Sequence, residues 1–105
     1  MVFIELPLFQ RLLTFSDEDL RKIQNVLLER PETGEVIVKG HGLRKMRVAL
    51  PGRGKSGRAR VIYYWRASVS LCYLVFAYPK NVMDDLSDKQ LKMLADTIQE
   101  VIENG

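Results

Sequence analysis

Four β-rich runs follow one another between residues 35 and 79, and they constrain the fold of this chain more than any other feature. Each is rich in β-branched or aromatic residues, and Gly-containing or short polar turns separate them. Closely spaced strands joined by short turns are typical of an antiparallel meander. The runs are EVIVKG (35–40), LRKMRVAL (43–50), RARVIYYWR (58–66) and SLCYLVFAYP (70–79).

A short β-type run, VFIEL (2–6), and two helical segments complete the chain. The first helix is expected to begin at Ser16, because its hydroxyl can cap free backbone amides and Asp19 stands where a capping-box acid belongs. Its apolar face holds Leu20, Ile23 and Leu27, with Val26 as an uncertain member, and Pro31 and Gly34 end it.

The second helix is expected to begin at Ser87, where Gln90 completes a capping box. An apolar stripe at helical spacing follows, made of Leu86, Leu91, Leu94, Ile98 and Val101. The element order therefore predicts an α+β fold, an antiparallel sheet with both helices packed on one face. At 105 residues, the chain is expected to form a single domain spanning 1–105.

The charge of the chain is distributed in blocks. Residues 36–83 hold ten Lys or Arg residues and no Asp or Glu, whereas the segments on either side are net acidic, so the net charge is only +3. A cationic block of this kind concentrates positive potential on one part of the surface and favours a polyanionic partner. A solvated basic face without a partner remains an alternative.

Several functional classes are disfavoured by the sequence. A single cysteine, Cys72, and a single histidine, His41, give no disulfide and no zinc-ligand spacing, so we expect no metal or cofactor. Cys72 lies in an apolar run and is expected to be a core thiol, while His41 lies between two glycines in a turn and is expected to be solvated. No run is long enough to span a membrane and the first residues lack a basic start, so we expect a soluble, cytoplasmic protein.

The segment PGRGKSGRAR (51–60) formally matches two nucleotide-binding patterns. A G-x-G-x-x-G dinucleotide loop needs a helix after it, but the following residues predict a strand. The phosphate-binding pattern ending in Gly-Lys-Ser needs a glycine at position 49, which is Ala49. We therefore interpret the segment as a hairpin connection that carries cations, namely Arg53, Lys55 and Arg58.

Alternation along RARVIYYWR places all of its cations on one face of the sheet. That face holds Arg58, Arg60, Ile62, Tyr64 and Arg66, and the other holds Ala59, Val61, Tyr63 and Trp65. Cations next to aromatic rings suit RNA, because cations neutralise phosphates and rings stack on unpaired bases. Core packing is preferred for Tyr63 and Trp65, whereas for Tyr64 stacking and packing are equally favoured.

Several linked motifs in one order resemble the RelE/HigB superfamily of bacterial toxins, and especially its HigB-like branch. They are GLRKMRVALPGRGKSGRARVIYYW (42–65) and YLVFAYPKNVMDDLSDKQLKML (73–94). The resemblance implies a small microbial-RNase-like fold and a toxin of a type II toxin–antitoxin system. Such toxins are ribosome-dependent endoribonucleases, or mRNA interferases, that cut mRNA in the ribosomal A site without a metal. A non-catalytic RNA- or ribosome-binding module remains the alternative.

The resemblance also implies roles for individual residues and partners. Arg60 is similar to the arginine that binds the scissile phosphate, and Lys55 and Lys80 occupy the basic positions expected to assist catalysis. RNA contacts are expected from Arg44, Lys45, Arg47, Arg53, Arg58 and Tyr64. The expected partners are the ribosome, mRNA and a cognate antitoxin of helix-turn-helix type, with no cofactor.

Overall fold

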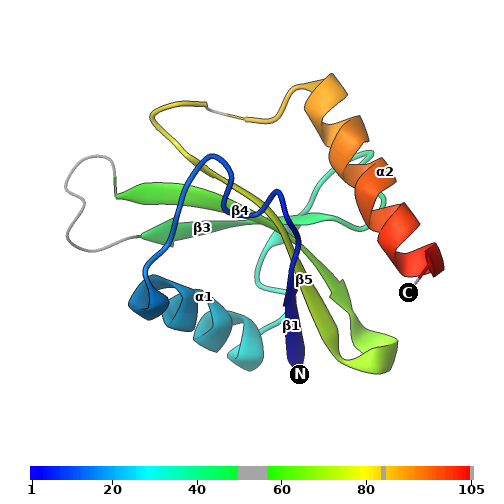
Figure 1. The fold of residues 1–105 in the computed structure, drawn as a ribbon, viewed down its shortest axis with the longest axis horizontal. Coiled ribbons are helices and arrows are strands. Elements are labelled where there is room, and N and C mark those ends of the chain that lie inside the picture. Colours follow the sequence, from blue (N-terminus) through cyan, green and yellow to red (C-terminus); the bar gives the residue numbers. More distant parts are fainter. Residues whose placement is uncertain (50–56, 84, 105) are drawn as a thin grey trace.

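The computed structural model covers the whole chain and describes residues 1–49, 57–83 and 85–104. In chain order, the elements are β1 (Val2–Glu5), α1 (Asp17–Glu29), β2 (Glu35–Val36), β3 (Arg44–Ala49), β4 (Arg58–Arg66), a short 3₁₀ helix (Ala67–Val69), β5 (Leu71–Pro79) and α2 (Asp88–Asn104) (Figure 1). Within these residues, neither helix is long and apolar enough to cross a membrane.

The five strands form one sheet in the order β1-β5-β4-β3-β2. Strands β2 to β5 are the expected antiparallel meander, and β1 adds to β5 in the parallel direction. The prediction of an α+β fold is confirmed, and the predicted antiparallel sheet is found except for the parallel edge strand β1. The first run of the meander is shorter than predicted, because the chain turns after Val36 and the Gly40 N–H donates to the Ile37 carbonyl at 2.9 Å.

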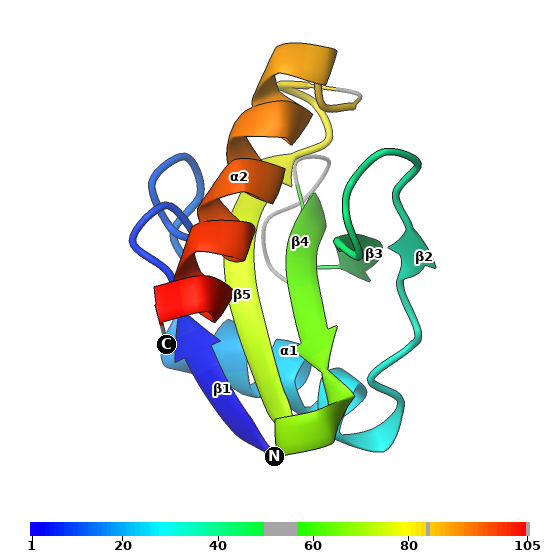
Figure 2. The same ribbon diagram turned by 90° about the vertical axis from the view of Figure 1, so that its right-hand side faces the viewer.

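The two helices cover opposite faces of the sheet, so the prediction that they share one face is wrong (Figure 2). On the α1 face, Ile23 and Leu27 belong to the cluster that contains Tyr63 of β4. On the α2 face, Leu94 and Ile98 belong to the cluster that contains Ile62 of β4 and Tyr78 of β5. The physical reason is that β4 is buried on both sides from residue 59 to 63, and such a strand needs cover on both sides.

A β-bulge in β5 changes which residues share a face. Ile62 pairs with Phe76 but Tyr63 pairs with Leu74, so Val75 is an extra residue on β5. Strict alternation would place Tyr78 on the same face as Leu74. The bulge instead brings Tyr78 to the α2 face, while Leu74 stays on the α1 face.

Both helix starts predicted from capping residues are confirmed. The Ser16 hydroxyl accepts from the Asp19 N–H at 3.1 Å. Ser87 and Gln90 form a reciprocal box, in which the Ser87 N–H donates to Gln90 Oε1 at 2.8 Å and the Gln90 N–H donates to Ser87 Oγ at 3.1 Å. Val26, the uncertain member of the α1 stripe, is 46% exposed and lies outside the core.

Candidate functional site

A row of polar side chains crosses the central strands on the α2 face of the sheet. Arg47 of β3 is paired with Arg60 of β4, and Arg60 is paired with Tyr78 of β5. Arg47 is exposed, Arg60 is 8% exposed and Tyr78 is fully buried, so the row runs from the surface into the core. Arg60 Nη1 donates to the Ala59 carbonyl at 3.3 Å.

Lys45 lies on the same face, two residues before Arg47 on β3. Its Nζ donates to Asp85 Oδ1 at 3.2 Å, which joins β3 to the segment before α2. The Leu86 N–H donates to the same carboxylate oxygen at 2.9 Å. These contacts, first the Leu86 amide and then Lys45, hold the pKa of Asp85 below its usual range, and the charge of Arg60 acts in the same direction.

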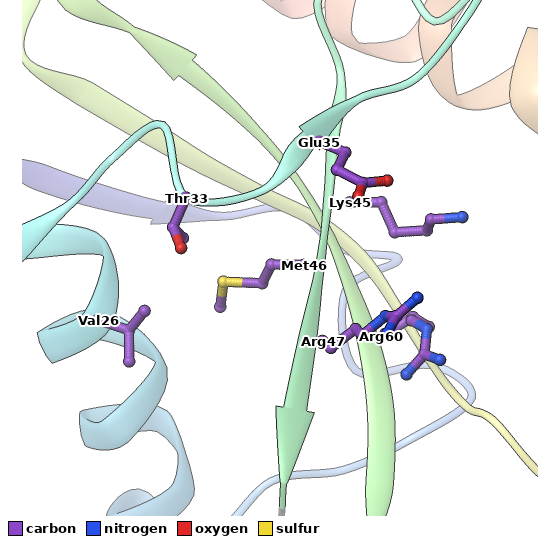
Figure 3. A pocket seen from close by; sticks show the side chains of 7 residues that line it. All are labelled: Val26, Thr33, Glu35, Lys45, Met46, Arg47 and Arg60. Atoms are coloured by element: carbon purple, nitrogen blue, oxygen red, sulfur yellow. The ribbon is translucent and has the colours of Figure 1, made fainter.

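The cations line two hollows. The larger, about 460 Å³, lies along the outer edge of β3, and Figure 3 shows Lys45, Arg47 and Arg60 along one side of it. It is lined by Val26, Thr33, Glu35, Lys45, Met46, Arg47 and Arg60. The edge is open there because β2 pairs only with Arg44 and Lys45, and no described strand pairs with the rest of β3 on that side.

The second hollow, about 340 Å³, has Arg47 and Arg60 in its wall as well. Arg58 and Lys80 line it too, and these residues are held together because the Lys80 N–H donates to the Arg58 carbonyl at 3.0 Å. Arg47 and Arg60 therefore line both hollows, and three further cations, Lys45, Arg58 and Lys80, each line one of them. Like charges on directly opposed strand positions repel each other, so an anion between them would be bound favourably.

The structure separates the predicted site residues into groups. Lys45, Arg47, Arg58, Arg60 and Lys80 are brought together on the two hollows. Arg44 lies apart from them: its Nη1 donates to the Gly34 carbonyl at 2.8 Å and to the Glu32 carbonyl at 3.2 Å, which anchors the loop before β2.

Tyr64 also lies away from the two hollows. It is half-buried against the α2-side cluster, and its ring centroid is 6.4 Å from that of Tyr73. Gly42 packs against the edge of the Tyr64 ring, since a Cβ at position 42 would lie 2.8 Å from Tyr64 Cε2. This environment fits the packing interpretation of Tyr64. Arg53 and Lys55 lie outside the described residues.

Tyr78 and Asp85, which pair with Arg60 and Lys45 of this site, were not among the predicted site residues. Tyr78 was not predicted because the bulge at Val75 moves its side chain to the α2 face, away from the face that strict alternation gives. Asp85 was not predicted because its partner, Lys45, is 40 residues away in the chain. The signal present in the sequence was that Asp85 is among the first acids after the acid-free block and lies two residues before the predicted helix start at Ser87.

Other reactive groups do not add to the site. Cys72 is buried, and burial raises the pKa of its thiol to about 12, which suits the expected core role. His41 is exposed in its turn, with φ of 54°. Among the described residues, His, Cys, Asp and Glu side chains form no group of three or more that could hold a metal ion.

The fold and the site together define a small α+β domain with a strongly basic sheet face. Comparison with known families agrees: the model of the family described as "RelE toxin of RelE / RelB toxin-antitoxin system" matches residues 9–104. The chain therefore belongs to the RelE toxin family. Toxins of this family act with an antitoxin partner and are generally endoribonucleases.

Proposed function

We propose that this chain is a ribosome-dependent mRNA endonuclease that cuts mRNA in the ribosomal A site without a metal and so inhibits translation. The observation that supports this most strongly is the pairing of Arg47 with Arg60 beside Lys45, in a chain of the RelE toxin family. A cationic pair at a hollow is suited to one RNA phosphate, whose two non-bridging oxygens accept hydrogen bonds from both guanidinium groups.

The chemistry follows from what metal-free RNA cleavage requires. The 2′-hydroxyl oxygen bonds to the adjacent phosphorus and gives up its proton to a base, the bond to the 5′-oxygen breaks, and that oxygen takes up a proton. Charge builds up on the phosphate oxygens in the transition state. Arg60 is nearly buried and held on a central strand, so it can stabilise that charge with little reorganisation.

The other cations would position the RNA. Arg47, Lys45, Arg58 and Lys80 surround Arg60 and would contact neighbouring phosphates. For Lys80, a direct catalytic role is the alternative. Lys55 and Arg53 remain predictions that rest on the family resemblance, and we assign Arg44 to loop anchoring rather than to RNA.

We further propose that the chain is one RelE-like domain of the HigB-like branch, as the ordered motifs between 42 and 94 suggest. Its antitoxin is proposed to be of the helix-turn-helix type, and its place of action to be the cytoplasm, where ribosomes and mRNA meet. The acid-free block gives both partners, RNA and an acidic antitoxin segment, a complementary surface.

Induced expression of the chain alone tests this function. Growth and protein synthesis should stop. Primer extension should find new mRNA ends within codons that occupy the ribosomal A site. Arg60→Ala should lower the cleavage rate by about 10²-fold or more, as expected for loss of a preorganised donor to the transition state.

The matched control is Arg21→Ala, which removes an equal charge from the exposed surface of α1, on the other side of the sheet. Its cleavage should match that of the unaltered chain. Ribosome association without new mRNA ends would instead support the non-catalytic RNA-binding module, and intact mRNA with normal growth at verified expression would refute the endonuclease function.

A further inference from the structure

Tyr78 carries a buried hydroxyl that the fold does not use. The residue is fully buried, and its O–H has no hydrogen-bond partner among the described residues. Buried polar groups in folded proteins are nearly always paired, so each exception calls for an explanation. A phenylalanine would fill the same space, including the ring contact with Phe76 at 6.1 Å between centroids, without an unpaired hydroxyl.

The position of this hydroxyl relates it to the basic face. Tyr78 is directly opposite Arg60 across β4 and β5, on the α2 face. The charges of Asp85 and Arg60 both act on the pKa of this phenol. Tyr78 therefore lies at the inner end of the Arg47–Arg60 row, and Lys45 on the same face of β3 holds the Asp85 carboxylate.

Asp85 stands where an RNA phosphate would meet this row. Its carboxylate accepts from Lys45 Nζ and from the Leu86 N–H, as a phosphate oxygen would. The carboxylate is 68% exposed, and an exposed ion pair of this kind is weak and readily exchanged for another anion. A phosphate bound by Lys45 and Arg60 would take the place of the Asp85 carboxylate.

We propose that the Tyr78 hydroxyl is a catalytic hydrogen-bond donor, which reaches a non-bridging oxygen of the scissile phosphate once that phosphate has replaced Asp85 beside Lys45 and Arg60. This inference rests on the proposed endonuclease function. It adds a neutral donor to a site otherwise made of cations, and it explains why a hydroxyl is retained where phenylalanine would pack equally well.

The phenol acts as a donor and not as a base. Burial, and then the charge of Asp85, raise its pKa, while Arg60 lowers it, and the net direction is upward. The phenol therefore keeps its proton at neutral pH. No bond to Tyr78 is made or broken: its hydrogen bond to the phosphate oxygen strengthens as negative charge grows there in the transition state.

Tyr78→Phe tests the inference, because it removes the hydroxyl and keeps the ring. Purified toxin is mixed with ribosomes carrying an mRNA codon in the A site, and both single-turnover cleavage and binding are measured. The variant should lose about 10²-fold in maximum rate, and its affinity for ribosomes should stay within about twofold. Its urea midpoint should equal or exceed that of the unaltered chain, since the folded protein loses no contact.

The matched control is Tyr73→Phe, on the same strand and in the same α2-side cluster, 3% exposed. This variant should cleave at the unaltered rate. Unaltered cleavage by Tyr78→Phe, or a marked loss of stability in it, would overturn the role of Tyr78 while leaving the endonuclease function intact. Absence of cleavage by the unaltered chain would overturn the endonuclease function itself, and the role of Tyr78 with it.

Discussion

Tyr63 and Tyr78 lie on neighbouring strands, are both fully buried, and face opposite sides of the sheet. The Tyr63 O–H donates to the Pro31 carbonyl at 2.7 Å and accepts from the Gly34 N–H at 2.8 Å. The Tyr78 O–H has no such partner among the described residues. Burial raises the pKa of both phenols, so burial alone does not distinguish them.

The arginines differ in the same way. Arg44, on the α1 side, donates to two backbone carbonyls of the loop that Tyr63 also holds. Arg60, on the α2 side, is paired across the strands with another arginine. The Tyr63 hydroxyl and Arg44 on the α1 face therefore bond within the fold, whereas the Arg47–Arg60 pair and the Tyr78 hydroxyl on the α2 face are the groups to which we assign the proposed RNA contact.

The largest expected effects on stability come from the two apolar clusters, because each face of the sheet is covered by one of them. Leu27→Ala in α1 and Leu94→Ala in α2 should each lower the free energy of unfolding by about 2–5 kcal/mol, because both side chains are essentially fully buried. Urea denaturation followed by circular dichroism measures this. Leu28→Ala, at a 52% exposed position of α1, is the control and should cost less than about 1 kcal/mol. A small loss for either buried leucine would show that its face is not a true core.

The next effect is a difference in stability between the Tyr63→Phe and Tyr78→Phe variants. Tyr63→Phe leaves the Pro31 carbonyl and the Gly34 N–H without their partner, and Gly34 is buried. We expect a loss of about 1–3 kcal/mol in the free energy of unfolding. Tyr78→Phe should cost nothing or be stabilising under the same urea titration. Equal losses in the two variants would remove the distinction between the faces.

The sequence predicts the parts of this structure that depend on neighbouring residues. Ser16 and Ser87 cap their helices as expected, and alternation along β4 correctly places Arg60 with Ile62 and apart from Val61. These features need only local hydrogen bonds or the two-residue period of a strand.

The remaining features depend on pairings between distant segments. The bulge at Val75 is a property of how β5 pairs with β4, and nothing local in LCYLVFAYP marks it. The contact between Lys45 and Asp85 joins residues 40 apart. The cover on both faces follows from tertiary packing, although the unbroken apolar run VIY in β4 was a signal for it. Five cations of the candidate site were therefore named from the sequence, namely Lys45, Arg47, Arg58, Arg60 and Lys80, whereas Tyr78 and Asp85 were not.

A smaller effect tests whether Tyr64 belongs to the packed part of the α2 face. Gly42 has a φ of +93°, and a Cβ there would lie 2.8 Å from Tyr64 Cε2. Gly42→Ala should cost about 1–2 kcal/mol in urea denaturation, since alanine tolerates a positive φ poorly. Ribosome affinity should be unchanged. Weakened ribosome binding with full stability would return Tyr64 to the RNA-stacking role.

The smallest expected effect on stability concerns the Lys45–Asp85 ion pair on the α2 face. Asp85→Asn at neutral pH should lower the free energy of unfolding by less than about 1 kcal/mol, because the carboxylate is 68% exposed and solvent screens it. The pKa of Asp85 is lowered in the folded protein, so the pair stabilises the fold above the unfolded-state pKa of about 3.9. That contribution is lost as the pH falls through the folded-state pKa, and the variant and the unaltered chain should then converge.

Asp96→Asn is the matched control for this variant, because it breaks the exposed Lys92–Asp96 pair, at 3.0 Å, on α2. Both variants should change stability little, but Asp85→Asn alone should strengthen RNA binding at low salt, since it removes the anion that competes with phosphate for Lys45. A loss of more than about 2 kcal/mol in Asp85→Asn would exceed what exposed ion pairs contribute. Asp85 would then be a fixed part of the fold, and phosphate could not replace it in the way that access to Tyr78 requires.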